Sequence, residues 1–497
     1  MTSAPAPAHP SRADLFIDGS RVPPSTGEYR PVIDPSNGRP LGEVAVGSAG
    51  DAVHALEVAD REAESWGSTP GHVRSRLLRA VADRIDADRE GFARLISTEV
   101  GKPIVDARIE VERAAGVFRL AAEEVRHLTG ESFPADAYAL PPGNEHRWLF
   151  SVREPIGVVV AIGPFNFPLN LLSHKIAPGL AAGNPVVAKP TSAAPFTALR
   201  LAEHAAAAGI PAGVLNVVLG PGAAVGNALV EHPATRLVTF TGSTEVGKGI
   251  AERAARHAKR LILEMGGLDP LIVLEDAPLD RTVADAVRGA FTYAGQVCTA
   301  SKRILVHDRI ADAFAERFAR KAASLRVGPA LEETTQVGPV IDAGAIERLD
   351  GLVEDARRRH AEVLTGGGRV EGMPGTFYRP TVLDRVPAQA RVATEEPFGP
   401  VSPILRFHDD EEALRIANGT PYGLQASVYT NDLRRAFAFA RRIRAGGVHI
   451  NDPTNLRWDA LPFGGVKESG LGREGVRYAM QEMTELKLIS VNVDPGA

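Results

Sequence analysis

The stretch 237-LVTFTGSTEVGKGIAERAARH-257 contains a short apolar strand, a glycine turn and a helical segment. Similar strands surround it: GVVVAIGP, NPVVAKP, VLNVVLG and LILEMGG are short, β-branched and closed by Gly or Pro, with Ala-rich helical stretches between them. Strands that alternate with helices in this way predict a parallel sheet covered by helices on both faces. The sequence therefore predicts an α/β fold.

A second α/β series begins at DPLIVLED (269–276), continues through SKRILVH (301–307) and reaches GGVHIN (446–451). The chain has 497 residues, which is more than one ordinary hydrophobic core accommodates. The two series therefore predict two α/β domains.

Other segments add smaller features. Residues 51–128 have helical periodicity, and LFIDG (15–19) begins a region that predicts a short hairpin. Residues 139–155 look like a loop that leads into an extended, arm-like strand, and ELKLISVNVDPGA (485–497) alternates like an edge strand. Such a strand could extend a neighbouring sheet.

Composition narrows the class of protein. The 56 basic and 61 acidic residues give a formal net charge of −5, which argues against a nucleic-acid or membrane-surface partner. No apolar run approaches the roughly 20 residues needed to span a bilayer. The Pro/Ala-rich N-terminus lacks the apolar core of a signal peptide, so we expect residues 1–13 to form a flexible tail and the protein to be cytoplasmic.

Cys298 is the one cysteine of the chain, in FTYAGQVCTASKR (291–303). A single cysteine excludes an intrachain disulfide and any zinc site built on several cysteines, and we expect no metal. It lies in a turn-like Gly-Gln-Val-Cys segment, and the reactivity of a free cysteine usually decides its importance. Cys298 is therefore a candidate nucleophile.

Further candidates follow predicted strands. Lys189 ends NPVVAKP, where a side chain points into the crevice that binds ligands in open α/β sheets. Gly242 and Ser243 form the turn before a helix N-terminus, which suits phosphate. Asn166 in GPFNFPLN can stabilise an oxyanion, and Glu264 in LILEMGG can activate water. Each alone is equally compatible with an ordinary turn, cap or surface charge.

Taken in order, GPFNFP, VVAKP, FTGSTEVG, LEMGG, GQVC, EEPFGPV and PFGGVKESGLGREG resemble the motif series of the aldehyde dehydrogenase superfamily. The resemblance covers nearly the whole chain, points to the NAD(P)-dependent, non-acylating members, and looks closest to the lactaldehyde and non-phosphorylating glyceraldehyde-3-phosphate dehydrogenase group. It implies a Rossmann-like NAD(P) domain, an α/β catalytic domain and a β-strand oligomerisation arm that completes a partner's sheet in a homodimer or homotetramer. The implied divisions are 14–138 and 156–265 for the NAD(P)-binding domain, 266–447 for the catalytic domain, 139–155 and 480–497 for the arm, and 448–479 for the loop and C-terminal segment that line the substrate tunnel.

The resemblance also implies residue roles. Cys298 matches the nucleophile, Glu264 the general base, and Asn166 the amide that forms the oxyanion hole with the Cys298 backbone N–H. The implied cofactor contacts are Lys189 to the adenosine ribose, Gly242 and Ser243 to the pyrophosphate, and Glu396 and Phe398 to the nicotinamide ribose. In the implied reaction the thiolate attacks the aldehyde, hydride leaves to NAD(P)+, and water hydrolyses the thioester.

Two positions depart from the usual motifs. Phe165 replaces the tryptophan that usually precedes the oxyanion asparagine. Phenylalanine also occurs at this position in the CoA-acylating branch of the family, but the presence of Glu264 favours hydrolysis. A CoA-acylating semialdehyde dehydrogenase and a non-catalytic nucleotide-binding or structural member remain the alternatives. Ser192 stands where NAD-preferring members often carry a glutamate, so we expect NAD or NADP, with a slight preference for NADP tolerance.

Substrate residues are expected in NDPTNLRWDALPFGG and on the helix VERAAGVFRLAAEEV. In the first segment Arg457, Trp458 and Phe463 are candidates, and the guanidinium could bond a carboxylate, phosphate or sulfonate. On the helix, Arg113 and Arg119 lie at different angles, so both are not expected to line the tunnel. The expected substrate is a small aldehyde that could carry an anionic group, although arginines in so Arg-rich a chain can equally be solvated.

Overall fold

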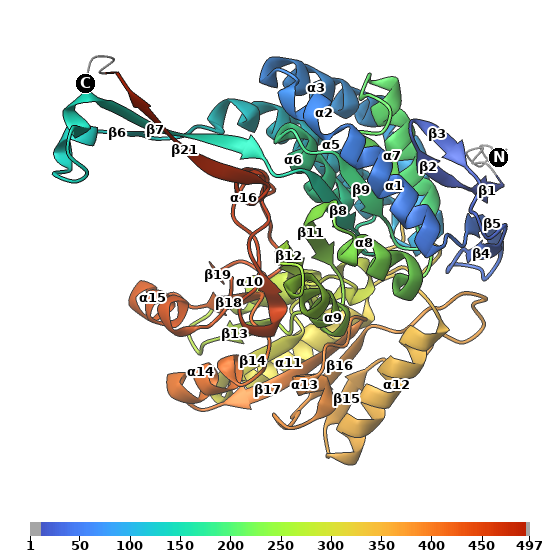
Figure 1. The fold of residues 1–497 in the computed structure, drawn as a ribbon. Coiled ribbons are helices and arrows are strands. Elements are labelled where there is room, and N and C mark those ends of the chain that lie inside the picture. The colour runs from blue at the N-terminus through green and yellow to red at the C-terminus, as the bar shows by residue number, and fades with distance from the viewer. Residues whose placement is uncertain (1–10, 494–497) are drawn as a thin grey trace.

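The computed structural model describes residues 11–493, which form two α/β units and a projecting arm (Figure 1). The first unit is built on a sheet of eight strands in the order β20-β12-β11-β8-β9-β10-β2-β3. Their bounds are β2 Leu15–Ile17, β3 Ser20–Val22, β8 Val158–Ile162, β9 Val186–Lys189, β10 Leu215–Val217, β11 Thr235–Thr241, β12 Arg260–Glu264 and β20 Gly470–Leu471.

The five central strands, from β12 to β10, are parallel, and antiparallel strands close both edges. Each residue of Val158–Ile162 is buried, as expected for a strand covered on both faces. The helices of this unit are α1 Ala49–Arg61, α2 Ala63–Ser68, α3 Gly71–Ala87, α4 Arg89–Val100, α5 Ile104–Glu124, α6 Asn170–Ala181, α7 Pro195–Ala207, α8 Asn227–Glu231, α9 Thr244–Ala255 and α16 Val476–Glu482. The predicted hairpin and the helical region 51–128 are thus present.

The second unit has a seven-stranded sheet in the order β15-β16-β17-β14-β13-β18-β19, parallel except for β15. Its strands are β13 Pro270–Val273, β14 Arg303–His307, β15 Glu362–Thr365, β16 Thr381–Asp384, β17 Val401–Phe407, β18 Gln425–Tyr429 and β19 Gly447–Ile450. Its helices are α10 Leu279–Phe291, α11 Asp308–Ala323, α12 Ala343–Arg358, α13 Arg391–Thr394, α14 Asp410–Asn418 and α15 Leu433–Arg442. Each unit has its own hydrophobic core, so the predicted α/β fold with two domains is confirmed.

The arm is a three-stranded sheet in the order β21-β7-β6 that extends away from both units (Figure 1). Its strands are β6 Ser132–Phe133, β7 Arg147–Pro155 and β21 Thr484–Asn492. The first strand lies before the expected start at residue 139. Met480 and Met483 lie outside the arm, because their fully buried side chains pack in the core of the first unit.

Residues 1–10 of the expected tail lie outside the described residues, but the expectation fails at its C-terminal end. Arg12–Ala13 forms strand β1, which pairs with β5 (Pro40–Ala45) in a small sheet completed by β4 (Tyr29–Ile33). Ala13 is fully buried, and the Arg12 guanidinium lies 4.6 Å from the centroid of the Tyr29 ring. These contacts fix a segment whose composition suggested flexibility.

Candidate active site

The Cys298 loop connects α10 to β14 through an unusual backbone. Tyr293 and Ala294 have φ values of +49° and +52°, and Gly295 follows at +68°. The left-handed conformation is costly for residues with a side chain, so the surrounding structure must hold this turn in place. Cys298 itself is partly exposed between the buried Val297 and Thr299.

Asn166 follows β8 and Glu264 ends β12, two parallel strands with β11 between them, so both residues lie at the carboxyl-end edge of the sheet. Asn166 is 2% exposed, and its Nδ2 donates to the Gln296 carbonyl oxygen at 2.9 Å, two residues before Cys298. Glu264 is 3% exposed, and both its carboxylate oxygens lack a hydrogen-bond partner among residues 11–493. The structure therefore joins the asparagine to the cysteine loop and leaves a buried carboxylate with free acceptors.

Burial sets the protonation of this cluster. It raises the pKa of the Cys298 thiol to about 12, because the thiolate loses its hydration. The cations of Lys302 and Arg457 act in the opposite direction. Burial also raises the pKa of Glu264 well above its usual range, and the charge of Glu474 adds to this effect. At neutral pH the thiol is therefore protonated and requires a base before it can attack.

Sequence reasoning missed the buried pair Lys175 and Glu474, whose Nζ and Oε1 are 2.6 Å apart. Glu474 also accepts a hydrogen bond from Arg457 Nη2 at 3.0 Å, and Arg457 and Lys175 both lower the pKa of Glu264. One signal was available in the sequence. Lys175 lies within the mostly apolar segment NLLSHKIAPGLA (170–181). In the structure every residue of this helix is buried, and a buried lysine requires a partner.

The Arg457 side chain is largely buried, although an arginine that binds an anion could equally be exposed to solvent. Its side chain is 9% exposed, and its guanidinium lies 3.8 Å from the centroid of the buried Phe463 ring. Its Nε is buried and has no hydrogen-bond partner in the described part of the chain. Trp458 is 54% exposed beside it, and its ring stacks on His449 at 6.4 Å between centroids.

Arg113 reaches the same segment from α5. Its Nη2 and Nε donate to the Asp459 carboxylate at 2.6 and 3.0 Å, and His174 Nε2 lies 2.9 Å from Asp459 Oδ1. Arg119 faces elsewhere and pairs with Asp86 on α3. As expected from the helix angle, the two arginines occupy different environments. Arg113 pairs with Asp459 and Arg457 with Glu474, and of the two only Arg457 has a buried Nε that makes no hydrogen bond within residues 11–493.

Lys189 ends β9 with its side chain directed into the protein. The residue is 8% exposed, and its amine has no hydrogen bond or ion pair recorded among the described residues. Burial lowers the pKa of this amine to about 8. A Cβ at Gly226, in the segment that follows β10, would lie 3.9 Å from Lys189 Cε, an ordinary van der Waals contact. A buried, unpartnered amine at a strand end fits a ligand's hydroxyl or phosphate oxygens.

Gly242 and Ser243 form the turn between β11 and α9. A Cβ at Gly242 would lie 2.5 Å from the Phe240 ring, so only glycine fits without rearrangement. Ser243 caps α9 by accepting a hydrogen bond from Val246 N at 3.4 Å, and the exposed Val246 leaves this helix N-terminus open to solvent. Ser192 is also exposed. These features suit a phosphate-bearing ligand.

Glu396 and Phe398 follow α13 and lie near the Cys298 loop. Glu396 Oε1 is 2.9 Å from Lys302 Nζ, and the same ammonium contacts the Cys298 carbonyl oxygen. Phe398 packs edge-to-face on Phe165, with 5.7 Å between ring centroids. The phenylalanine that replaces the usual tryptophan therefore keeps an aromatic ring beside the candidate asparagine.

The aldehyde dehydrogenase family model matches residues 22–489, nearly the whole chain. The chain belongs to the aldehyde dehydrogenase family. It is similar to the glutarate-semialdehyde dehydrogenase of Pseudomonas putida, with 38% identity over 97% of this chain and 98% of that protein. It is 40% identical to the lactaldehyde dehydrogenase of Methanocaldococcus jannaschii over 96% of this chain and 100% of that one.

A solved structure described as an E. coli NADP-dependent enzyme superposes on this aldehyde dehydrogenase with a TM-score of 0.93. The two are 38% identical, and the match covers 97% of this chain and 98% of that one. The protein is thus an NAD(P)-dependent aldehyde dehydrogenase, as the motif series predicted. None of the helices within residues 11–493 is long and apolar enough to cross a membrane.

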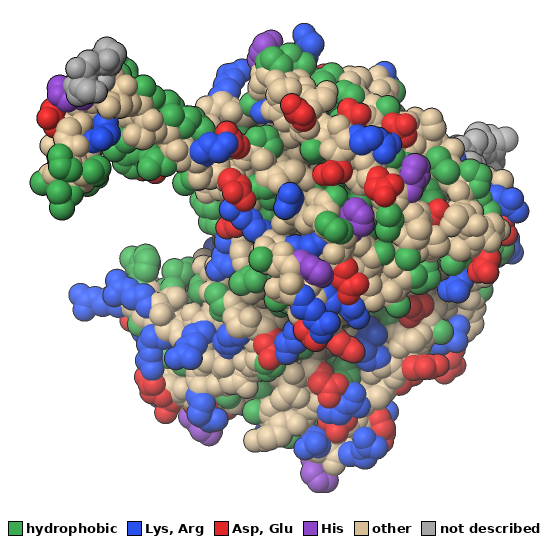
Figure 2. Space-filling model, in the orientation of Figure 1, with side chains coloured by type: hydrophobic (Ala, Val, Ile, Leu, Met, Phe, Trp, Pro, Cys, Tyr) green, Lys and Arg blue, Asp and Glu red, His purple; other side chains and the backbone are tan. Residues whose placement is uncertain are grey.

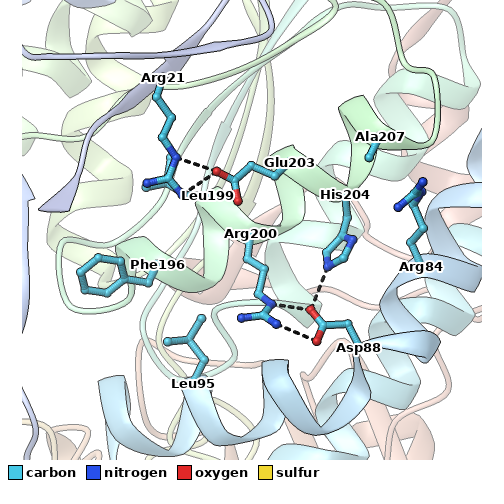
Figure 3. Close-up of a pocket in the computed structure, with 10 residues that line it drawn as sticks. All are labelled: Arg21, Arg84, Asp88, Leu95, Phe196, Leu199, Arg200, Glu203, His204 and Ala207. Atoms are coloured by element: carbon cyan, nitrogen blue, oxygen red, sulfur yellow. Dashed lines mark hydrogen bonds and ion pairs between the residues drawn. The ribbon is translucent and has the colours of Figure 1, made fainter. Parts of the chain in front are cut away.

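Not every cavity of this aldehyde dehydrogenase belongs to the candidate site. A pocket of about 590 Å³ lies between β3, α3, α4 and α7 (Figure 3). Its charged side chains largely neutralise one another: Arg21 pairs with Glu203, and Arg200 and His204 share Asp88. It contains none of the expected site residues. Among residues 11–493, no group of three or more His, Cys, Asp or Glu side chains could hold a metal ion.

Proposed function

We propose that this aldehyde dehydrogenase oxidises a small aldehyde with an anionic group to the carboxylic acid, with water as the acyl acceptor. Glu264 carries the proposal: it is a buried carboxylate with two unpartnered oxygens in the cluster that contains the Cys298 thiol. Such a group suits proton abstraction from water. Transfer to CoA would not require it.

In the proposed reaction the Cys298 thiol loses its proton to a base, and sulfur attacks the aldehyde carbon. The oxyanion is held by the Cys298 backbone N–H and by the Asn166 Nδ2 hydrogen that does not bond to Gln296. A bound nicotinamide would accept the hydride that leaves this carbon. Water then attacks the thioester, Glu264 takes its proton, and the carboxylic acid and the thiol are released.

The residues present fit a dinucleotide. Lys189 supplies a buried unpartnered amine, and the turn Gly242–Ser243 presents an exposed helix N-terminus. We assign the adenosine ribose to Lys189, the pyrophosphate to the turn, and the nicotinamide ribose to Glu396 and Phe398. Ser192 brings no negative charge to the ribose, which supports acceptance of a 2′-phosphate, and the similar E. coli enzyme is NADP dependent.

We assign the anionic group of the substrate to Arg457. Its buried Nε donates no hydrogen bond within residues 11–493, although Asp459 Oδ1 lies 3.9 Å away, and its Nη2 shares the Glu474 carboxylate with Lys175. This spare donor supports the role. Phe463 supports the guanidinium from beneath, and Trp458 and Arg113 border the same region. The similar glutarate-semialdehyde dehydrogenase acts on an aldehyde that carries a carboxylate, whereas lactaldehyde carries a hydroxyl.

We propose that the arm pairs with another copy in a homodimer or homotetramer. The exposed side chains of Leu486, Leu488 and Trp148 cover the arm, where hydrophobic side chains gather (Figure 2). Strands β21 and β19 each have a free edge in their sheets. Pairing of two such edges would cover the apolar surface. The reduced thiol that the reaction needs fits a cytoplasmic setting.

The test is dinucleotide reduction with NAD+ and NADP+ against matched aldehydes, without CoA. Succinate semialdehyde and its neutral analogue butyraldehyde differ in the carboxylate, so comparing them tests recognition of the anionic group. Lactaldehyde tests recognition of a hydroxyl group. Arg457→Met should lower kcat/KM roughly 10- to 100-fold more for succinate semialdehyde than for butyraldehyde, as for loss of a hydrogen bond to a charged group, because any effect through Glu264 is common to both substrates. Equal losses on both substrates would contradict the role of Arg457, and activity only with added CoA would contradict that of Glu264.

A further inference from the structure

The ion pair between Lys102 and Glu110 is buried away from solvent, with side chains 1% and 0% exposed. Lys102 lies between α4 and α5, and Glu110 lies on α5. Desolvation makes a buried pair of charges expensive, and apolar side chains in its place are often equally stabilising. A contribution to stability therefore does not explain why charges occupy this position.

The carboxylate contacts the loop that carries Asn166. Glu110 Oε1 accepts hydrogen bonds from the backbone amides of Leu169 at 2.9 Å and Asn170 at 3.1 Å. These amides open α6, three and four residues after the asparagine, where the helix leaves its first N–H groups unpaired. Glu110 therefore fixes the end of the Asn166 loop, while its other oxygen holds Lys102.

The ammonium contacts both loops of the candidate oxyanion hole. Lys102 Nζ lies 3.6 Å from the centroid of Phe167, which follows Asn166, and 4.6 Å from that of Tyr293 in the Cys298 loop. The two rings meet edge-to-face at 6.4 Å. A desolvated cation between two aromatic rings attracts both.

The cysteine loop needs such a restraint. Tyr293 adopts a left-handed backbone conformation, and its hydroxyl donates to the Val100 carbonyl oxygen at 2.8 Å, two residues before Lys102. Closer to the nucleophile, the hydrogen bond from Asn166 to Gln296 joins the two loops. The contacts of the Lys102 ammonium with the Phe167 and Tyr293 rings form a second link between the two loops.

We propose that Lys102 and Glu110 are a positioning pair that keeps the Asn166 amide and the Cys298 backbone N–H in register as the two halves of the oxyanion hole. The pair acts through the loops and touches no reacting atom. This inference rests on the proposed roles of Asn166 and Cys298, and it assigns a kinetic function to residues outside every motif of the sequence.

The test variant is Lys102→Met/Glu110→Gln, which removes both charges and keeps an amide oxygen for the α6 backbone. The matched control is Glu99→Gln. Glu99 is 1% exposed and accepts the Phe196 and Thr197 amides at the start of α7, the same task on a helix without a candidate catalytic residue. Two rates are measured: reduced dinucleotide formed in the first turnover, and cofactor-free acylation of Cys298 by p-nitrophenyl acetate, which releases p-nitrophenolate through a tetrahedral oxyanion.

We expect the double variant to slow both rates roughly 10- to 100-fold, up to the roughly 100-fold cost of a 1 Å displacement and below the roughly 10²- to 10³-fold cost of losing an oxyanion donor outright. In the double variant, the affinity for the dinucleotide and the midpoint of urea unfolding should stay near the wild-type values. The control Glu99→Gln should show both rates at the wild-type level. Wild-type rates in the double variant, or equal losses in the control, would overturn the proposal.

Asn166→Ala separates the two levels of inference. In that background, removing the pair should slow acylation less than threefold further, because the donor it positions is gone. A full additional tenfold loss would show that the pair acts elsewhere. If Asn166→Ala alone leaves the acylation rate unchanged, the oxyanion role of Asn166 is wrong and the positioning role of the pair is wrong with it. If Asn166→Ala slows acylation but Lys102→Met/Glu110→Gln does not, only the positioning role is wrong.

Discussion

The buried amine of Lys189 predicts that binding of NADP+ depends on pH in a range where NAD+ binding does not. Burial lowers the pKa of this amine to about 8, well below that of a lysine in water. A dianionic 2′-phosphate attracts only the ammonium form, whereas ribose hydroxyls can bond to either form. NADP+ binding should therefore be strongest below pH 8 and weaken as the free protein loses this proton.

The magnitude follows from that pKa. An amine that titrates at about 8 is nine-tenths protonated at pH 7 and one-tenth protonated at pH 9. If only the ammonium form binds the phosphate, the Kd for NADP+ rises about tenfold between these values, or about 1.4 kcal/mol. The Kd for NAD+ should change less than threefold. At pH 9 NADP+ binding should also take up close to one proton per site.

Titration calorimetry at pH 7, 8 and 9, in buffers with different ionisation enthalpies, measures both the Kd and the proton uptake. Lys189→Met should weaken NADP+ binding roughly 10- to 150-fold at pH 7, as for a hydrogen bond to a charged group, and abolish the pH dependence. A flat NADP+ affinity from pH 7 to 9, or an unchanged pH profile in Lys189→Met, would refute the assignment.

Three other results are expected. Iodoacetamide should alkylate Cys298 in the cofactor-free protein far more slowly at pH 7 than it alkylates free cysteine, because burial raises the pKa of the thiol to about 12. The alkylation rate should keep rising to pH 10, and a plateau near pH 8 would contradict this expectation. Lys175→Met should lower the free energy of unfolding by about 1–3 kcal/mol in urea, since Glu474 loses its closest cation and keeps only the hydrogen bond from Arg457; no measurable loss would contradict the buried-pair description. Leu488→Arg on the exposed arm should yield a smaller assembly by light scattering; an unchanged mass would exclude that face from the interface.

The sequence predicted what local pattern determines. Short β-branched strands closed by Gly or Pro indicated the two sheets, and side chains that follow strand ends, such as Asn166, Lys189 and Glu264, were expected at one edge because parallel strands align their carboxyl ends. The structure places Asn166 against the Cys298 loop, although their roles remain predictions. The Phe165 ring packs on Phe398, a contact that the motifs alone did not contain.

Partners far apart in the chain could not be predicted. Lys175 and Glu474 are 299 positions apart, and Arg113 and Asp459 are 346 apart, so nothing local indicates that these charges meet. Arg457 was expected to face a substrate anion, but the structure adds that Glu474 and the Phe463 ring already hold its guanidinium. Charge pairing across the two halves of the chain depends on the final packing.

In the proposed reaction, water activated by Glu264 hydrolyses the thioester on Cys298. Rapid mixing of Glu264→Gln with saturating NADP+ and aldehyde isolates this step. We expect a burst of one reduced dinucleotide per subunit, steady-state turnover slowed about 10²- to 10⁴-fold, and an acyl mass on the peptide that contains Cys298. Turnover at the wild-type rate, or a slow reaction with neither burst nor acylated Cys298, would contradict it.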